Sequence, residues 1–222
     1  MKRILILPCL AACLAGSVSG PALAGEQLPD SCKPKVAGGA LALAGDADAA
    51  QLQCDVDRAA ILADRSDALF GAVADPLVRI VDTTSPSGAA YVYYVTEDDG
   101  AMRLDARSVP ADMDDSRTVP VCHLGTVLGD DVSNKVSIAL VDSASPDVPG
   151  YAERMEVIVN PDGSRKSVLM LDSHDVVTMA RTASGARNFS RHIRQTEDIV
   201  GKLNELIIGV ANVSDGWDCN AS

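Results

Sequence analysis

Aromatic residues are scarce in this chain. Only 3% of its 222 residues are Phe, Trp or Tyr, although 47% are hydrophobic overall. Aromatic rings normally supply much of the apolar area that a core buries. The interior must here be built mainly from Val, Leu, Ile, Ala and Met, and a chain of this length is long enough to form one such core.

Basic residues are also few. The chain has 19 Lys and Arg against 31 Asp and Glu, which gives a net charge of −12. Because binding to a phosphate backbone requires concentrated Lys and Arg, this composition argues against nucleic acid as a partner. The charge favours solubility and weak self-association.

The motifs of several catalytic and metal-binding classes are missing. The chain has no C-x-x-C pair, which argues against a thioredoxin-like redox role and against a zinc knuckle. It also has no G-x-S-x-G nucleophile elbow, no H-E-x-x-H metal motif and no EF-hand loop. We therefore expect neither a cofactor nor a metal. The preferred hypothesis is a non-enzymatic binding or accessory protein.

Long hydrophobic runs are missing except at the N-terminus. Residues 4–15 form an uncharged run of roughly 12 residues behind Lys2 and Arg3, whereas a membrane-spanning helix needs about 20. A basic start followed by a short apolar run is typical of a secretory signal peptide. We therefore predict a signal peptide over residues 1–24.

The leader allows two forms of the mature protein. Ala22 and Ala24 form an A-x-A cleavage site, and cleavage there would release residues 25–222 as a single globular domain in the periplasm or outside the cell. Alternatively, the segment Leu-Ala-Ala-Cys that ends at Cys13 resembles a bacterial lipoprotein box, and a lipid on Cys13 would tether the protein to a membrane. The first form is favoured because Pro8 interrupts the short run before Cys13.

Four cysteines follow the leader, and we expect them to form two disulfides. An even number of cysteines in an exported chain is typical of a disulfide framework, and four cysteines allow three pairings. We favour a bond between Cys32 and Cys54, which closes a short N-terminal loop. The other pair, Cys122 and Cys219, would tie the C-terminal tail to the middle of the chain.

Hydrophobic periodicity predicts a helix near each end of the mature chain. Apolar residues recur at three- and four-residue intervals over residues 46–63, with Asp46 as the expected N-cap. A second apolar stripe, over residues 193–210, predicts an amphipathic C-terminal helix whose N-cap would be Asn188 or Ser190.

Between these helices the period changes to that of strands. About six to eight short runs joined by turns predict an antiparallel meander, in which residues 118–128 and 135–142 are two of the runs. The clearest hairpin joins residues 155–160 to residues 166–171, because Asp-Gly supplies the positive φ that a tight turn needs. The sequence therefore predicts an α+β fold whose C-terminal helix covers the sheet.

Histidines offer an alternative, enzymatic function. Ser173, His174 and Asp175 are the residue types of a hydrolytic triad, but neighbours on an extended chain point to opposite faces and cannot form its relay. A small periplasmic hydrolase would need residues from separate turns. In this hypothesis His174 or His123 is the general base and Asp172 is its carboxylate partner.

A basic segment interrupts the acidic chain near its C-terminus. Arg181, Arg187, Arg191 and Arg194 lie here, with no carboxylate between residues 175 and 197. If the helix begins near Asn188, Arg191 and Arg194 lie in its first turns, where positive charge opposes the helix dipole. We therefore consider an anion-binding patch for a phosphate, a carboxylate or an acidic partner such as an unknown protein or envelope component. Alternatively, the arginines pair with the protein's own carboxylates.

Acidic turns are the remaining candidates. Carboxylates cluster at residues 97–99, 112–115 and 130–131, and turns rich in oxygen ligands suit calcium. Because none of the clusters has EF-hand spacing, we expect solvated turns rather than calcium sites.

Overall fold

The computed structural model describes residues 29–32, 44–83, 88–111, 120–151, 155–169 and 174–220. A seven-stranded sheet organises these residues, with strand order β8-β7-β1-β2-β3-β4-β9. All pairings between its named strands are antiparallel. The strands are β1 (Val78–Asp82), β2 (Ala89–Asp98), β3 (Ala101–Pro110), β4 (Val121–Val127), β7 (Asp175–Thr182), β8 (Gly185–His192) and β9 (Asp218–Asn220).

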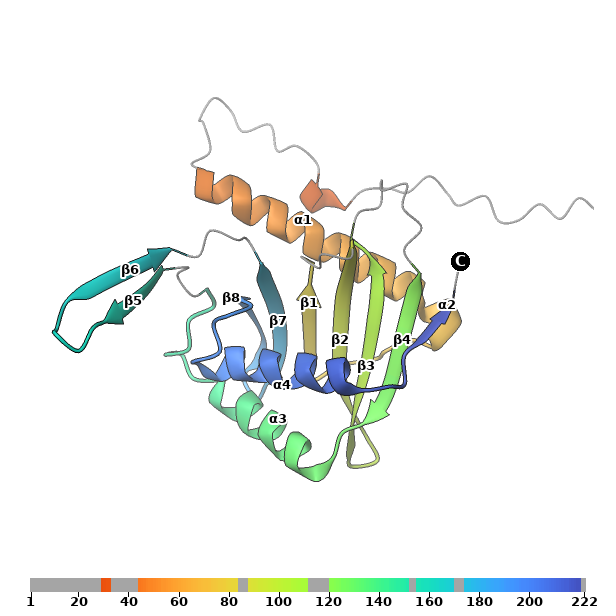
Figure 1. Cartoon of the computed structure of the whole chain (residues 1–222). Helices are drawn as coiled ribbons and strands as arrows, with labels where there is room; N and C mark the ends of the chain where they lie inside the picture. Colours follow the sequence, from red (N-terminus) through yellow and green to blue (C-terminus); the bar gives the residue numbers. More distant parts are fainter. Residues whose placement is uncertain are drawn as a thin grey trace, which may run out of the picture.

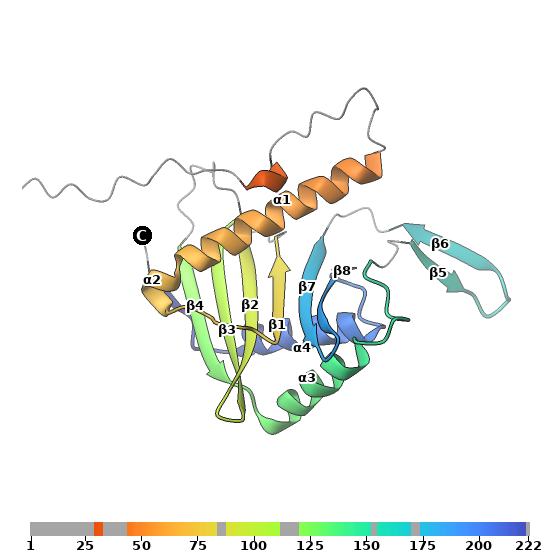
Figure 2. The same cartoon turned by 180° about the vertical axis from the view of Figure 1, so that it is seen from behind.

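Helices cover both faces of this sheet. Helix α1 crosses one face, whereas α3 and α4 lie on the other (Figures 1 and 2). The described helices are η1 (Asp30–Cys32), α1 (Ala44–Arg65), α2 (Asp67–Phe70), α3 (Asp130–Asp142) and α4 (Ile199–Val213). The prediction of an α+β fold with an antiparallel sheet and a helix toward each end is therefore confirmed. None of the described helices is long and apolar enough to cross a membrane.

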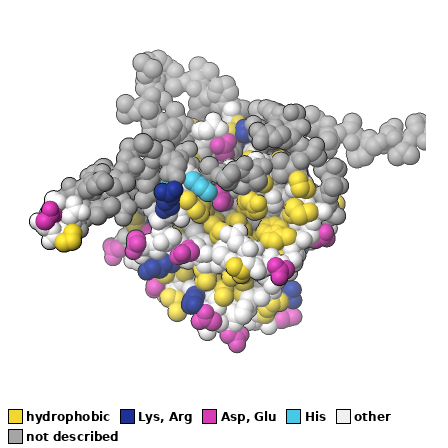
Figure 3. Space-filling model, in the orientation of Figure 1, with side chains coloured by type: hydrophobic (Ala, Val, Ile, Leu, Met, Phe, Trp, Pro, Cys, Tyr) yellow, Lys and Arg dark blue, Asp and Glu magenta, His cyan; other side chains and the backbone are white. Residues whose placement is uncertain are grey.

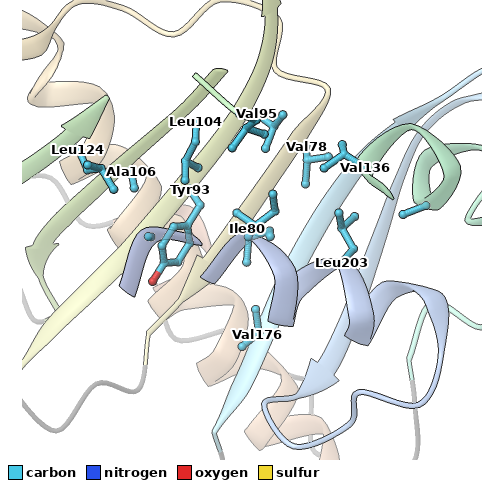
Figure 4. Packing of buried hydrophobic residues seen from close by; sticks show 14 residues of the cluster. Val78, Ile80, Tyr93, Val95, Leu104, Ala106, Leu124, Val136, Val176 and Leu203 are labelled. Atoms are coloured by element: carbon cyan, nitrogen blue, oxygen red, sulfur yellow. The ribbon is translucent and has the colours of Figure 1, made fainter. Parts of the chain in front are cut away.

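Each face of the sheet buries its own hydrophobic cluster. On the α4 face, Val78, Ile80 and Tyr93 pack with Leu203 of α4 (Figure 4). On the α1 face, alternate residues of the same strands pack against the helix. These residues are Val81, Val92 and Tyr94 of the strands and Val56, Ala59 and Ala63 of α1. Burial on both faces explains why residues 89–95 of β2 form an uninterrupted apolar run.

Both predicted disulfides are present. Cys32–Cys54 joins η1 to α1, and Cys122–Cys219 joins directly paired residues of β4 and β9. Trp217 holds the chain just before β9, because its Nε1 donates to the Ala211 carbonyl at 3.1 Å. The predicted signal peptide and Cys13 lie outside the described residues.

The prediction of a strand over residues 135–142 is wrong, because this segment belongs to α3. Val136 and Ala139 are buried one helical turn apart, so the apolar run faces the core with helical spacing. Asp130 and Asp131 occupy the first turn of α3, where negative charge is favoured by the helix dipole. The meander is therefore interrupted by a helix after β4.

The predicted starts of the two long helices are also wrong. Asn188 and Ser190 lie in β8, and α4 begins only after Asp198, whose Oδ1 accepts a hydrogen bond from Gly201 N at 2.8 Å. The first helix begins at Ala44, so Asp46 lies inside its first turn rather than at the N-cap.

A separate two-stranded hairpin projects from the body of the molecule (Figure 1). Its strands are β5 (Met155–Val159) and β6 (Arg165–Leu169). Its turn forms as predicted: Gly163 has a φ of 82°, and Asp162 Oδ1 accepts from Ser164 N at 2.9 Å.

Candidate functional site

Both candidate general bases are paired with an aspartate, but neither is paired with the partner that the sequence suggested. His123 Nε2 lies 2.9 Å from Asp105 Oδ2, and His174 Nε2 lies 2.9 Å from Asp82 Oδ1. Asp172, the predicted partner, lies outside the described residues. His123 of β4 contacts Asp105 of the neighbouring strand β3, and His174, which directly precedes β7, contacts Asp82 at the end of the neighbouring strand β1. Strand pairing therefore brings together residues that are far apart in the sequence.

The His123 pair opens into a cleft of about 450 Å³ on the α1 face of the sheet. Strands β2, β3 and β4 form its floor, and residues 72–74 form a wall. These wall residues belong to the α2–β1 connection, which crosses the strands beyond the end of α1 (Figure 2). The volume is within the usual range of small-molecule sites.

The strand register places the polar residues of the cleft on one face. Arg107 pairs with His123 and Asp105 pairs with Gly125, so these four residues alternate with residues of the opposite core. A Cβ on Gly125 would lie 3.3 Å from His123 Cε1, so the glycine leaves room for the imidazole ring. On its other side the ring stacks on Phe70, with centroids 4.6 Å apart.

Arg107 fixes the aspartate of this pair. Its side chain is fully buried, and its Nε donates to Asp105 Oδ1 at 2.9 Å while Nη1 donates to Asp67 Oδ1 at 2.6 Å. The same guanidinium also donates to the carbonyls of Ala63 and Gly71, each at 2.6 Å. Burial alone would lower the pKa of Arg107, but hydrogen bonds to the two aspartates outweigh it and raise that pKa.

The cleft offers mainly hydrogen-bond acceptors. Asp105 accepts from Arg107, and if His123 Nε2 carries its proton toward Asp105, Nδ1 is left as an acceptor. Within the described chain this Nδ1 has no hydrogen-bond partner. Glu97 and Asp98 add two carboxylates at the mouth of the cleft.

The cationic side chain that lines the cleft is Arg103, and its Nε lies 3.7 Å from Asp98. The lining hydroxyl groups belong to Thr96 and Thr126, and none of the described lining residues is Ser or Cys. The cleft therefore combines an excess of negative charge with an acceptor-rich floor, and it lacks a serine or cysteine nucleophile among those residues.

Arg191 and Arg194 do not lie in the first turns of the C-terminal helix, so the expected conflict of their charge with the helix dipole is wrong. Arg187 and Arg191 lie in β8, and Arg194 follows that strand. The Arg187 guanidinium donates to three carbonyls of the α3–β5 connection, at 2.5 to 2.8 Å. The acceptors are the carbonyls of Ser143, Ser145 and Val148.

Arg191 also acts inside the molecule. It is buried, and its Nε donates to Asp198 Oδ2 at 2.7 Å while Nη2 donates to the Pro149 carbonyl at 2.7 Å. Arg181 pairs with Asp75 at 2.9 Å on the surface. Arg181 and Arg191 thus pair with carboxylates of the protein itself, as the alternative expected, whereas Arg187 donates to backbone carbonyls.

The acidic clusters do not converge on a cation site. Glu97 and Asp98 end β2, whereas Asp130 and Asp131 lie in the first turn of α3. Residues 112–115 lie outside the described part of the chain. Among the residues that the structure describes, no group of three or more His, Cys, Asp or Glu is arranged to hold a metal ion.

The sequence singled out His123 but missed its surroundings. Asp105 and Arg107 alternate with the apolar residues Leu104 and Ala106, which indicates that they share one face of a strand. Nothing in the sequence pairs that strand with His123. The chain matches no protein-family model, no curated protein and no solved structure. Its function must therefore be argued from its own geometry.

Proposed function

We propose that the protein is an exported, non-enzymatic binding protein whose cleft beside His123 holds a small organic cation. The observation that carries this proposal is the excess of acceptors and carboxylates in a cleft of small-molecule size. A ligand with an ammonium or guanidinium group satisfies these acceptors. An anion would instead face Glu97 and Asp98, with Arg103 as the one arginine or lysine among the described lining residues.

The geometry suggests how such a ligand is held. Arg107 orients Asp105, and Asp105 orients His123 in turn. In the neutral tautomer with Nε2–H toward Asp105, Nδ1 of His123 accepts one N–H of the ligand. The carboxylates of Glu97 and Asp98 supply charge at the mouth. Residues 72–74, which are Ala, Val and Ala, give an apolar wall against which the carbon chain of the ligand packs.

Export is supported by two independent features. The two disulfides are typical of proteins that mature in an oxidising compartment, and the N-terminal pattern is that of a signal peptide. We propose a periplasmic or secreted location, with lipidation at Cys13 as the alternative. Edman sequencing or mass spectrometry of the native N-terminus tests this: a start at residue 25 supports soluble export, and an acylated Cys13 supports the tether.

Calorimetric titration tests the ligand class. We expect agmatine and putrescine to bind and succinate not to bind, with an affinity for the cations that falls as salt is added. The double variant E97Q/D98N should weaken cation binding by about tenfold, because each lost carboxylate removes up to about 1 kcal/mol of attraction. The matched control is D142N/D147N, which changes net charge equally at exposed positions outside the cleft. Equal binding of succinate, or equal losses in both variants, would contradict the proposal.

A hydrolase is the second candidate, because the His123–Asp105 pair has the orientation of a general base. With Nε2–H directed to Asp105, Nδ1 can take the proton of a water molecule that attacks an ester or amide carbonyl. Such an enzyme would act without a covalent intermediate, so hydrolysis of p-nitrophenyl esters should show no burst. His123→Ala should abolish the activity and His174→Ala should preserve it. Equal activity in the two variants would exclude His123 as the base.

A further inference from the structure

A second concave site lies on the opposite side of the sheet, in the groove between α3 and α4. Its volume is about 430 Å³, close to that of the His123 cleft. Its floor is aliphatic, with Ile138 and Ala139 from α3 and Ile199, Leu203 and Leu206 from α4. Hydrophobic side chains gather on this face of the molecule (Figure 3).

Two lysines line the groove as well. The described part of the chain contains three lysines, at positions 135, 166 and 202, and two of them line this groove. The Lys135 ammonium group pairs with Asp131 at 2.6 Å on the surface. The Lys202 ammonium group has no hydrogen-bond or ion-pair partner among the described residues, and Glu205 is the carboxylate that lines the groove beside it.

The aliphatic floor and the lysine together indicate what kind of ligand the groove would bind. Ile138 is 58% exposed at the groove, so an aliphatic side chain is left in water where a ligand chain could cover it. The Lys202 ammonium group of α4, which has no partner within the described part of the chain, lies next to this apolar surface in a protein of net charge −12. We infer that the α3–α4 groove binds a single-chain amphiphile with an anionic head, of the fatty-acid class, with its acyl chain on Ile138 and its carboxylate at Lys202.

The size of the groove favours this occupant over a protein helix. A volume of about 430 Å³ is sufficient for one small ligand. The groove is lined by eight residues, whereas a specific protein interface uses about 20 to 30 residues on each partner. The site is separate from the His123 cleft, since the sheet lies between them. The inference therefore stands or falls independently of the proposed function.

Three dodecyl compounds with different heads test the inference on the full chain. We expect dodecanoate, below its micelle-forming concentration, to bind with one site per molecule in calorimetry. Dodecyltrimethylammonium and dodecyl maltoside should bind at least about tenfold more weakly. Amide signals that shift in NMR spectra should belong to α3 and α4. Equal binding of the three compounds, or shifts confined to other elements, would overturn the inference.

Two exposed substitutions locate the head and the chain of the ligand. Lys202→Glu should weaken dodecanoate binding by about tenfold, because an exposed attraction becomes a repulsion, whereas the matched reversal Arg181→Glu should leave it unchanged. Ile138→Glu should abolish binding, and Val213→Glu, at a position 81% exposed outside the groove, should not. Because all four positions are exposed, the variants should fold, and circular dichroism checks this.

Vesicles distinguish a free ligand from a membrane surface. The protein should not sediment with vesicles of phosphatidylcholine and phosphatidylglycerol, since the inferred ligand is a single free chain. Sedimentation with these vesicles without binding of monomeric dodecanoate would overturn the inference, as would unchanged affinity in both Lys202→Glu and Ile138→Glu.

Discussion

At the scale of single residues, Arg107 connects α1, α2 and the cleft beside His123. Its guanidinium reaches the last turn of α1 through Ala63, reaches α2 through Asp67, and reaches the cleft through Asp105. Positive charge is favoured at the C-terminal end of a helix, so a strand residue stabilises the end of α1 and at the same time orients the aspartate behind His123.

Replacing Arg107 should therefore destabilise the fold. We expect Arg107→Met to lower the free energy of unfolding by about 3 kcal/mol or more, because removal of one partner of a buried ion pair leaves the others unsatisfied. Arg103→Met is the control on the same strand, since its side chain is 56% exposed and its loss should change stability by less than about 0.5 kcal/mol. Urea denaturation measures both, and similar losses in the two variants would contradict a structural role for Arg107.

Two buried tyrosines should make the protein sensitive to alkali. Burial raises the pKa of Tyr93 and Tyr94 above the ordinary value of 10.0, and the nearby charges of Asp82 and Asp64 add to these shifts. The unfolded chain therefore loses two protons near pH 10 that the folded chain keeps. The resulting stabilisation is complete below pH 10 and is lost as the pH rises above it, by up to about 1.4 kcal/mol per pH unit for each tyrosine.

Urea denaturation between pH 8 and pH 11.5 measures this slope. The double variant Y93F/Y94F should show a flatter dependence, because phenylalanine has no proton to lose. The hydroxyl of Tyr94 lies 3.5 Å from Asp64, so its removal leaves no strong hydrogen bond unmade. A slope in the double variant as steep as in the natural protein would show that other groups are responsible.

The candidate site shows what sequence can predict about single residues. His123 and His174 were identified by residue type alone, and both lie in His–Asp pairs. Their partners are 18 and 92 residues away in the chain, and only strand register brings them together. The basic segment that contains Arg191 and Arg194 is visible in the sequence, but the conflict with the helix dipole depended on a helix start that is wrong.

At the scale of elements, the strands were easier to predict than α3. The segments that form β2 and β3 are bounded by turn residues, and their residue patterns are typical of strands. In contrast, residues 136–141 are Val, Ser, Ile, Ala, Leu and Val, a composition that suits a strand as well as a helix. Two features favour the helix: its first turn is acidic, and Val136 and Ala139 are buried one helical turn apart. The burial of these residues is known only from the tertiary structure.

Replacing two glycines of α4 by alanine should change stability in opposite directions. A Cβ on Gly201 would lie 1.8 Å from the Gln195 carbonyl oxygen, whereas a Cβ on Gly209 would have no neighbour within 4 Å. Alanine is favoured over glycine in helices by up to about 1 kcal/mol. Gly209→Ala should therefore raise the free energy of unfolding by up to about 1 kcal/mol, while Gly201→Ala should lower it by about 1 to 3 kcal/mol through overpacking.

Thermal or urea denaturation of the two variants checks the opposed signs. Both substitutions add the same methyl group to the same helix, so helix propensity cancels in the comparison. If both variants were stabilised alike, the close approach of the Gln195 backbone to the start of α4 would be refuted.

At the scale of the whole molecule, one sheet separates two different concave sites. The α1 face carries the acidic cleft beside His123, and the α4 face carries the aliphatic groove beside Lys202. The strands between the two sites are buried on both faces, so a packed sheet separates the two sites. Binding on one face should therefore have little effect on affinity at the other, in keeping with the separate tests of the two sites.

The two disulfides join different parts of the molecule. Cys32–Cys54 attaches η1 to α1 and closes a sequence separation of 22, whereas Cys122–Cys219 attaches the three-residue strand β9 to β4 and closes a separation of 97. A strand as short as β9 has few hydrogen bonds of its own. We therefore expect its place at the sheet edge to depend on the covalent bond.

Removing each bond separately tests this dependence. On the chain-entropy model, a loop of about 20 residues contributes roughly 3 kcal/mol and one of about 100 residues nearly 5 kcal/mol, so C122A/C219A should lose more stability in urea than C32A/C54A. Amide exchange should also differ: without the Cys122–Cys219 bond the outer amides of β4 should lose protection as β9 detaches, because that edge becomes unpaired. The greater loss in C32A/C54A, or full protection of β4 in C122A/C219A, would mean that β9 is held by packing around Trp217 instead.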